Sequence, residues 1–409
     1  MRRAQRQWVF ASGWEATAPC VGLGSNGPVH RNGEQGCSAA KYGAAHRGPN
    51  ASHAGAGSGR GESRWAVLGG EGLGGRSCVG VGSRGLGSER AHGYPAGVTV
   101  DPIELAIAQG RRQAEASDRD ITGAVDHFAT VLRPTVARWG LQVDHLLGGG
   151  AGMPTLAVTT ADGRPAVLKI AEPGAMDHAV QVMRAAHGRG YVHVLGWDPS
   201  HGALLTERLG ADLWTESTNL IDQARVVVPL LRQAWEVPLG VGRQDENKAQ
   251  GLAGILENLG PRYGNRHQGA VARARHYAEE LAATERPEVV CHGDPHPGNV
   301  LRRGDGWALI DPDGFVGERA YDLGVVLRDG CRELLAERST GERGSGDAAY
   351  RRLREASRLL AELAGEDEDR VWRWGFVERV TTGLYLAWFG YAEESGRFLD
   401  SAALLAAHC

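Results

Sequence analysis

The chain has 409 residues, 42% of them hydrophobic, so it is long enough for two or three domains and apolar enough to build real cores. It contains no apolar span of 18 residues, which excludes a predicted membrane crossing, and its opening apolar run is too short for a signal peptide. Six cysteines without Cys-x-x-Cys or zinc-finger spacing argue against disulfides and structural zinc. We therefore expect a cytoplasmic globular protein with no membrane partner.

Residues 1–97 differ from the rest in composition, since 23 of the 60 glycines fall within the first 100 residues. This segment has 11 Lys and Arg against 5 Asp and Glu, which leaves 34 against 44 for the remainder. A segment with a net charge of about +6 therefore precedes a body with a net charge of about −10. The composition predicts a disordered tail, or an extension from a start codon assigned too far upstream. It lacks Arg-Gly-Gly repeats and regular aromatic spacing, so we do not expect a nucleic-acid partner.

Segments with a regular spacing of hydrophobic residues begin near residue 98, and the first of them predict both helices and strands. The expected elements are helices within residues 101–140 with an interruption at Pro134, two strands at 154–174 around the turn Asp162-Gly163, a helix at about 175–187 and a strand within 201–210. The pattern then becomes mostly helical. We therefore predict a small α+β unit over residues 98–210 and a larger, mainly helical unit over 211–409.

One polar stretch interrupts the helical half, VVCHGDPHPGNVLRRGDGWALIDPDGF at residues 289–315. Asp294 and Asn299 lie five positions apart on an irregular loop, and Asp311 follows twelve residues later at the end of an apolar strand. Phosphoryl transfer from a nucleotide needs a carboxylate to accept a hydroxyl proton and oxygen ligands for magnesium. Asp294 alone would be an ordinary turn residue, but the three residues at these spacings favour a kinase.

The pattern His-Gly-Asp-x-x-x-x-Asn, followed by Asp after a short hairpin, resembles the aminoglycoside phosphotransferase family, relatives of the protein kinases. The stretches at residues 310–329 and 372–390 are similar to its branch of streptomycin kinases and hydroxyurea phosphotransferases. The resemblance covers about residues 141–390. It implies an α+β, two-lobed protein-kinase-like fold, with an antiparallel sheet and nucleotide binding in the N-lobe (98–210), and with the catalytic loop and substrate site in the mainly helical C-lobe (211–409).

Carried onto this sequence, the resemblance makes Asp294 the catalytic base that orients the attacking hydroxyl. Asn299 and Asp311 would hold Mg²⁺. His292 would brace the catalytic loop without taking part in the chemistry, and Asp322 would pin that loop through backbone contacts. The implied cofactors are ATP and Mg²⁺.

On the N-lobe, the resemblance makes Lys169 the partner of the α- and β-phosphates and places adenine against the backbone near Glu207 to Leu209. Two features depart from the kinase pattern. The glycines at 148–152 do not form Gly-x-Gly-x-x-Gly, and the helix after Lys169 has no glutamate to pair with it. Asp177 is the nearest acid, and Glu172 is a second candidate. Either Asp177 pairs at a longer distance or different angle, or the nucleotide site is impaired.

Six aromatic residues gather in the late helix: Trp372, Trp374, Phe376, Tyr385, Trp388 and Phe389. Because every face of this helix carries apolar residues, we expect most of the six aromatic side chains to lie in a buried core. One or two of them would face the substrate pocket, which we expect among the C-terminal helices.

The family implies a small-molecule kinase that transfers the ATP γ-phosphate to a hydroxyl of a streptomycin-like aminoglycoside, giving antibiotic resistance. The acidic body favours a cationic acceptor. Hydroxyurea, or another small metabolite, is the alternative acceptor within the family. A pseudokinase that binds nucleotide without turnover is the alternative from another class, and a Ser/Thr protein kinase is disfavoured because no Ala-Pro-Glu follows Asp311.

Overall fold

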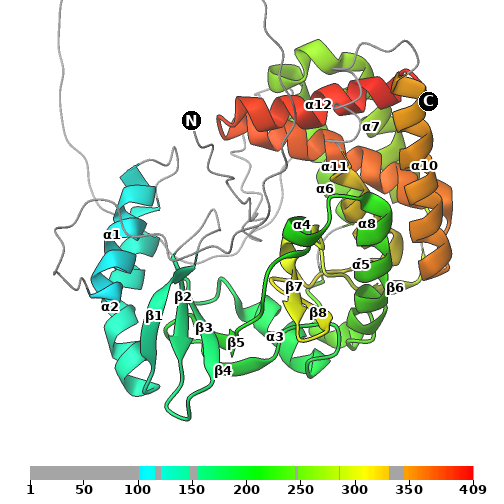
Figure 1. The fold of residues 1–409 in the computed structure, drawn as a ribbon. Coiled ribbons are helices and arrows are strands. Elements are labelled where there is room, and N and C mark those ends of the chain that lie inside the picture. Colours follow the sequence, from blue (N-terminus) through cyan, green and yellow to red (C-terminus); the bar gives the residue numbers. More distant parts are fainter. Residues whose placement is uncertain are drawn as a thin grey trace, which may run out of the picture. The chain divides into compact units, whose positions relative to one another are not determined.

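The computed structural model describes residues 101–115, 121–147, 154–244, 247–284, 286–330 and 345–408 (Figure 1). The predicted tail and the glycines at 148–152 lie outside the described residues. Among the helices that are described, none is long and apolar enough to cross a membrane.

A five-stranded antiparallel sheet in the order β1-β2-β3-β5-β4 forms the N-lobe (Figure 1). Its elements are β1 (Gln142–Leu147), β2 (Thr155–Thr159), β3 (Pro165–Ile170), α3 (Asp177–Ala186), β4 (Val194–Asp198) and β5 (Ala203–Glu207). The predicted β2–β3 hairpin, α3 and β5 are confirmed. β1 and β4 were not predicted, because each has a register shift, at Val143/His145 and Val194/Gly196, that breaks the alternation of buried and exposed positions.

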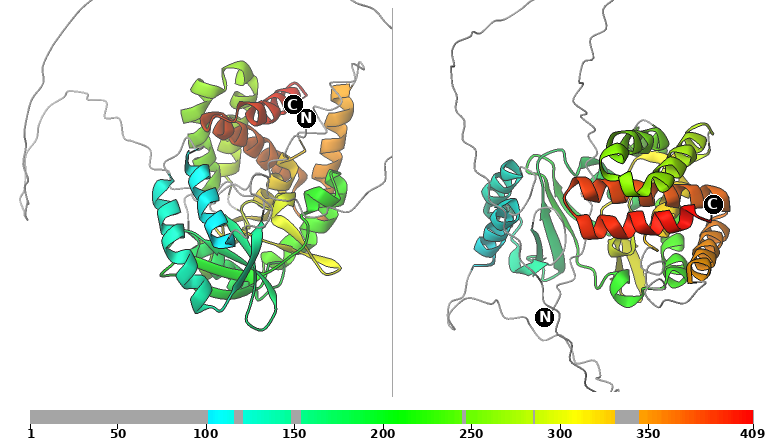
Figure 2. Two further views of the ribbon diagram at one scale, coloured as in Figure 1. Left: turned by 60° about the vertical axis from the view of Figure 1, so that its left-hand side comes forward. Right: turned by 90° about the horizontal axis from the view of Figure 1, so that it is seen from above.

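Two helices, α1 (Pro102–Glu115) and α2 (Thr122–Arg138), cover one face of this sheet (Figure 2). The predicted interruption at Pro134 is wrong, since α2 continues through it. Proline in a helix interior removes one hydrogen bond and disfavours the turn before it. Here Leu132 and Thr135, on either side of the exposed proline, are buried toward the sheet, so tertiary packing overrides the local preference.

The other face of the sheet packs into the C-lobe. Successive residues of a strand point to opposite faces, so Leu205 of β5 joins the core under α1 and α2, whereas Leu204 joins the large core of the C-lobe. On β3, Leu168 and Ile170 belong to the core under α1 and α2. Lys169 between them therefore points toward the C-lobe.

The C-lobe is mainly helical, as predicted. Its helices are α4 (Leu213–Glu216), α5 (Leu220–Ala234), α6 (Lys248–Tyr263), α7 (Gln268–Ala282), α8 (Arg319–Arg328), α10 (Ser345–Ala364), α11 (Glu368–Trp388) and α12 (Ala392–Ala406), with short 3₁₀ turns η1 (Leu239–Val241), η2 (Asn265–His267) and η3 (Pro297–Asn299). Two two-stranded antiparallel sheets carry the polar stretch: β6 (Glu288–Val290) pairs with β9 (Val316–Glu318), and between them in the chain β7 (Val300–Arg303) and β8 (Gly306–Leu309) form a hairpin. The two-lobed α+β architecture is confirmed.

Helix α11 runs through the centre of the C-lobe and packs against α6, α7, α8, α10 and α12. Its aromatic residues Trp372, Trp374 and Phe376 are buried, which confirms the expected core role for this part of the helix. Trp388, at the C-terminal end of the helix, is 51% exposed and does not belong to the core.

Candidate active site

The loop that contains Asp294 lies between β6 and η3, and its backbone is held by the carboxylate of Asp322 in α8. One oxygen of Asp322 accepts a hydrogen bond from Gly293 N (2.8 Å), and the other accepts from His292 N (2.9 Å) and Trp235 Nε1 (2.8 Å). Burial raises the pKa of Asp322 to about 6, although the three N–H donors act in the opposite direction. The structure therefore confirms the predicted backbone contacts of Asp322.

Replacing Asp322 by Asn is expected to lower the free energy of unfolding by about 2 kcal/mol or more, because buried donors left unpaired cost about 1–3 kcal/mol each. The amide has one acceptor oxygen for three donors, and its NH₂ group would face an N–H group. Urea unfolding at pH 7.5, above the pKa of Asp322, measures the change. An unchanged unfolding midpoint would show that the loop does not depend on this carboxylate.

His292 uses both ring nitrogens within the loop. Its Nδ1 accepts from Asp294 N (3.2 Å), so the proton of the neutral ring lies on Nε2, which donates to Ile310 O (2.9 Å). Burial lowers the pKa of His292 to about 4, so the ring is neutral at physiological pH. His292 braces the loop, as predicted, and has no free nitrogen for chemistry.

Asp294 lies in the loop with 7% of its surface exposed. Its Oδ1 accepts from Arg328 Nη2 at 3.0 Å, while Oδ2 lies 3.5 Å from His296 Nε2 and has no hydrogen-bond partner among the described residues. Burial acts to raise the pKa of Asp294, but the Arg328 guanidinium, which donates to Oδ1, holds it below its usual value. Asp294 is therefore a charged carboxylate with one oxygen available to accept a proton.

Hydrogen bonds of Asn299 connect the backbone of Asp294 to the segment that carries Asp311. Asn299 Nδ2 donates to Asp294 O (2.9 Å), and Asn299 O accepts from Ile310 N (3.0 Å), the residue before Asp311. The Oδ1 atom of Asn299 is buried and has no hydrogen-bond partner in the part of the chain that is described. Asp311 has a left-handed backbone with φ of +57°, which non-glycine residues adopt rarely and often at functional sites.

These two side chains suit magnesium, which prefers oxygen ligands and takes one or two from protein while phosphates and water supply the others. The described residues contain no group of three or more His, Cys, Asp or Glu that would hold a metal by itself.

Lys169 forms an ion pair with Asp311, at 2.6 Å from Oδ1 and 2.5 Å from Oδ2. Neither Asp177 nor Glu172 lies within ion-pair distance of Lys169 among the described contacts. Glu172 points elsewhere, since its Oε1 would be 3.8 Å from a Cβ atom added to Gly123 at the start of α2. Asp311, a residue of the C-lobe, is therefore the acid that pairs with Lys169 in this structure.

The connection between β5 and α4 joins the lobes. Glu207 Oε1 accepts from His193 N (2.8 Å) and from Arg303 Nη2 (2.5 Å), so the Glu207 side chain has a structural role here. Gly210 N donates to Arg302 O (2.8 Å). Among the described backbone hydrogen bonds, none has the N–H group of Leu209 as its donor. An adenine contact in this connection would therefore be a backbone contact.

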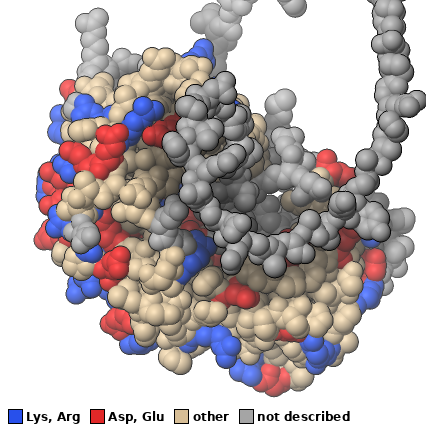
Figure 3. Space-filling view, turned by 180° about the vertical axis from the view of Figure 1, so that it is seen from behind, with Lys and Arg blue, Asp and Glu red and all other residues tan. Residues whose placement is uncertain are grey.

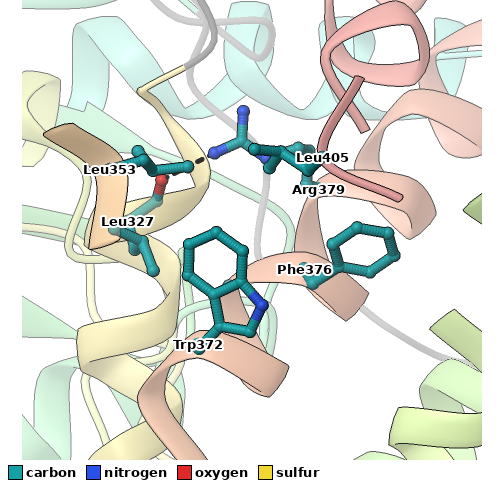
Figure 4. A pocket seen from close by; sticks show the side chains of 7 residues that line it. Leu327, Leu353, Trp372, Phe376, Arg379 and Leu405 are labelled. Atoms are coloured by element: carbon teal, nitrogen blue, oxygen red, sulfur yellow. Dashed lines mark hydrogen bonds between the residues drawn. The ribbon is translucent and has the colours of Figure 1, made fainter. Parts of the chain in front are cut away.

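A separate pocket lies in the C-lobe core (Figure 4), and its largest lining side chains are Leu327, Leu353, Trp372, Phe376, Arg379 and Leu405. Arg379 donates to Leu327 O at 2.9 Å and to Ser401 Oγ at 3.1 Å. The pocket is otherwise apolar and includes none of the predicted site residues. We assign it to core packing.

Sequence reasoning missed Arg328 and His296, the two side chains that face the carboxylate of Asp294. Arg328 is 34 residues from Asp294 and reaches it only because α8 packs under the loop. His296 is two residues from Asp294. Its position within the His-Gly-Asp-x-x-x-x-Asn pattern at residues 292–299 is the sequence feature that could have indicated a role at the site.

Known proteins resemble this chain over the same region. Residues 138–388 match the model of a family described as aminoglycoside/hydroxyurea antibiotic resistance kinase. A hydroxyurea phosphotransferase of Kitasatospora aureofaciens is 30% identical over 293 residues, which cover 69% of this chain and 79% of that protein. A streptomycin 6-kinase of Streptomyces glaucescens is 29% identical over 315 residues, which cover 74% and 94%.

Among solved structures, a thermostable mutant of aminoglycoside phosphotransferase APH(4)-Ia, in a ternary complex with AMP-PNP and hygromycin B, is 17% identical with a TM-score of 0.48. The similarity covers 68% of this chain and 100% of that chain. The family match extends from the end of α2 to the end of α11 and so includes every residue of the site described above.

Proposed function

The chain belongs to the aminoglycoside/hydroxyurea antibiotic resistance kinase family, and from this we propose that it transfers the γ-phosphate of ATP to a hydroxyl group of a streptomycin-like aminoglycoside. The observation that carries the proposal is the charged, buried carboxylate of Asp294, whose Oδ2 has no hydrogen-bond partner among the described residues. Asn299 donates to the backbone carbonyl of Asp294 and accepts from Ile310 N, next to Asp311, which pairs with Lys169.

In the proposed reaction, the backbone between Glu207 and Leu209 binds adenine, and Lys169 pairs with the α- and β-phosphates. Asn299 Oδ1 and the Asp311 carboxylate would hold magnesium, which supplies neutralisation of the phosphate charge. Asp294 Oδ2 orients the acceptor hydroxyl and accepts its proton as the oxygen bonds to phosphorus. Most of the rate acceleration would come from positioning and from charge neutralisation.

The charges near Asp294 support a cationic acceptor. Three acids, Asp294, Asp329 and Glu378, surround the guanidinium of Arg328 at 3.0, 3.2 and 3.6 Å. Asp294 and Glu378 are buried, and Asp329 is partly buried. Asp329 Oδ2 is buried without a hydrogen-bond partner in the described structure. On the outer face in Figure 3, acidic and basic side chains are interspersed. The local excess of acids at the site therefore supports attraction of a cation better than the net charge does.

The proposal predicts that streptomycin is a better acceptor than hydroxyurea or an uncharged sugar, with a Michaelis constant that rises with salt because the attraction is screened. ADP release with ATP and Mg²⁺, and product mass, measure this on the full chain. Hydroxyurea as the better acceptor would favour the other activity named among the relatives. ATP binding without transfer to any acceptor would favour a nucleotide-binding module without turnover.

A further inference from the structure

The imidazole of His296 lies directly beside the proposed catalytic base. Its side chain is 1% exposed, and Nε2 lies 3.5 Å from Asp294 Oδ2. Within the described structure, neither of these two atoms has a hydrogen-bond partner. Arg328 already holds the opposite oxygen, Oδ1. His296 is thus the side chain that faces the oxygen on which the proposed chemistry takes place.

The local contacts determine which nitrogen of His296 carries the proton. Gly298 N donates to Nδ1 at 3.0 Å, so Nδ1 is an acceptor and the proton of the neutral ring lies on Nε2. The protonated nitrogen Nε2 is therefore the one that lies 3.5 Å from Asp294 Oδ2, just beyond a normal hydrogen bond. A nitrogen that already bears a proton does not accept another, so the ring orients the carboxylate and does not relay its proton.

Trp214 of α4 holds the imidazole in place. The two rings are stacked, with centroids 4.7 Å apart and an interplanar angle of 21°. Gly298 makes the stack possible, because a Cβ atom there would lie 2.6 Å from Trp214 Cζ3 and 2.8 Å from His296 Cε1. Both contacts are too close for any other residue without movement of the rings.

Helix α4 is itself fixed beside the catalytic loop. Its first turn is capped by Asp212, whose Oδ1 accepts from Thr215 N (2.8 Å) and Thr215 Oγ1 (2.9 Å). Arg302 of β7, just after the loop, donates from Nε to Glu216 Oε1 (3.0 Å). Trp214 therefore belongs to a rigid element that also begins at the connection between the lobes.

We propose that His296, clamped by Trp214, is a positioning residue for phosphoryl transfer that fixes Asp294 Oδ2 toward the acceptor hydroxyl through its Nε2–H group. The inference rests on the proposed kinase activity. Catalytic hydrogen bonds are often long before substrate is bound, so a separation of 3.5 Å suits a contact that tightens during the reaction. Without this donor, Arg328 alone would set the angle of the carboxylate.

Two substitutions separate this role from a structural one. His296→Asn retains an oxygen that accepts from Gly298 N but removes the donor facing Asp294, whereas His296→Gln places an amide donor near the position of Nε2. We expect His296→Asn to lower kcat with streptomycin by ~10–100-fold, with KM for ATP and streptomycin within ~2-fold, because small errors in placement cost this much in rate. Its melting temperature should fall modestly, since a smaller side chain replaces a buried ring, but should stay well above the assay temperature. His296→Gln should recover part of kcat.

Trp214 supplies a second arm. Trp214→Leu should reduce kcat like His296→Asn, Trp214→Phe should reduce it less, and the double variant His296→Asn/Trp214→Leu should be no slower than His296→Asn alone, since both changes disturb one contact. His276→Asn, on the exposed face of α7, is the matched control and should leave kcat unchanged. Additive losses, or a fall in melting temperature that accounts for the lost activity, would overturn the proposal.

The ring spectrum gives a test that needs no acceptor. In ¹⁵N spectra of the full chain, His296, assigned by its loss in His296→Asn, should be the neutral Nε2–H form, and Asp294→Asn should shift its Nε2 signal. The Nδ1–H form, or a signal unchanged by Asp294→Asn, would refute the contact. If the unchanged protein does not phosphorylate streptomycin, the proposed function fails, while this spectrum still decides whether His296 faces Asp294.

Discussion

Replacing Asp294 by Asn is expected to reduce kcat by at least ~10²-fold, the size typical of losing a positioned general base, while ATP affinity changes little. Asparagine keeps the shape of the side chain, and its oxygen still accepts from Arg328. It removes the basic oxygen Oδ2, the atom that would take the hydroxyl proton. Steady-state kinetics with streptomycin, together with nucleotide binding by calorimetry, would measure the two quantities separately.

The matched control for Asp294 is Asp305→Asn, an exposed residue in the turn of the β7–β8 hairpin, which should leave kcat unchanged. Near-normal turnover in Asp294→Asn would rule out Asp294 as the base. A large drop in melting temperature would instead identify a structural role in the buried charge group around Arg328.

The second large effect is expected at Asp311. Asp311→Asn should weaken ATP binding in the presence of Mg²⁺ by ~10²-fold or more, and more than Asn299→Ala, because the aspartate carries the charge that a divalent cation requires. Asparagine is the suitable replacement because it tolerates the left-handed backbone at this position, whereas alanine would add strain. Titration of ATP with and without Mg²⁺ isolates the metal-dependent part.

Lys169→Met provides the comparison for Asp311, since it removes the partner of the carboxylate and should reduce ATP binding whether or not Mg²⁺ is present. If Asp311→Asn, Asn299→Ala and the unchanged protein bind Mg²⁺ and ATP equally, these residues do not hold a metal.

The sequence predicted the parts of the site that a short motif contains. Asp294, Asn299 and Asp311 lie within 18 positions, and the β7–β8 hairpin between Asn299 and Asp311 brings their backbones close with few alternatives. The aspartate that pins the loop was also predicted, from the family pattern. The assignments of Lys169, Asn299 and Asp311 to ATP and magnesium stay predictions.

The missed features depend on contacts between distant segments. Lys169 pairs with Asp311 across 142 positions, and no local pattern in β3 or α3 indicates that partner. Strand β1 escaped prediction because its bulge spoils the period of two, and α2 continued through Pro134 because the sheet holds the flanking turns. In each case contacts between distant segments determined the structure, and the local sequence pattern did not indicate it.

The alternation of Leu204 and Leu205 on β5 has a consequence for how the chain is divided. One strand contributes to two cores, so the N-lobe is not an autonomous folding unit. A fragment ending near residue 210 would leave Leu204 and the buried side of α3 without the C-lobe part of their shared core, including η1, and would expose that apolar face to water. The boundary between the lobes is therefore not a boundary between folding units, and we expect the smallest piece that folds cooperatively to contain both lobes.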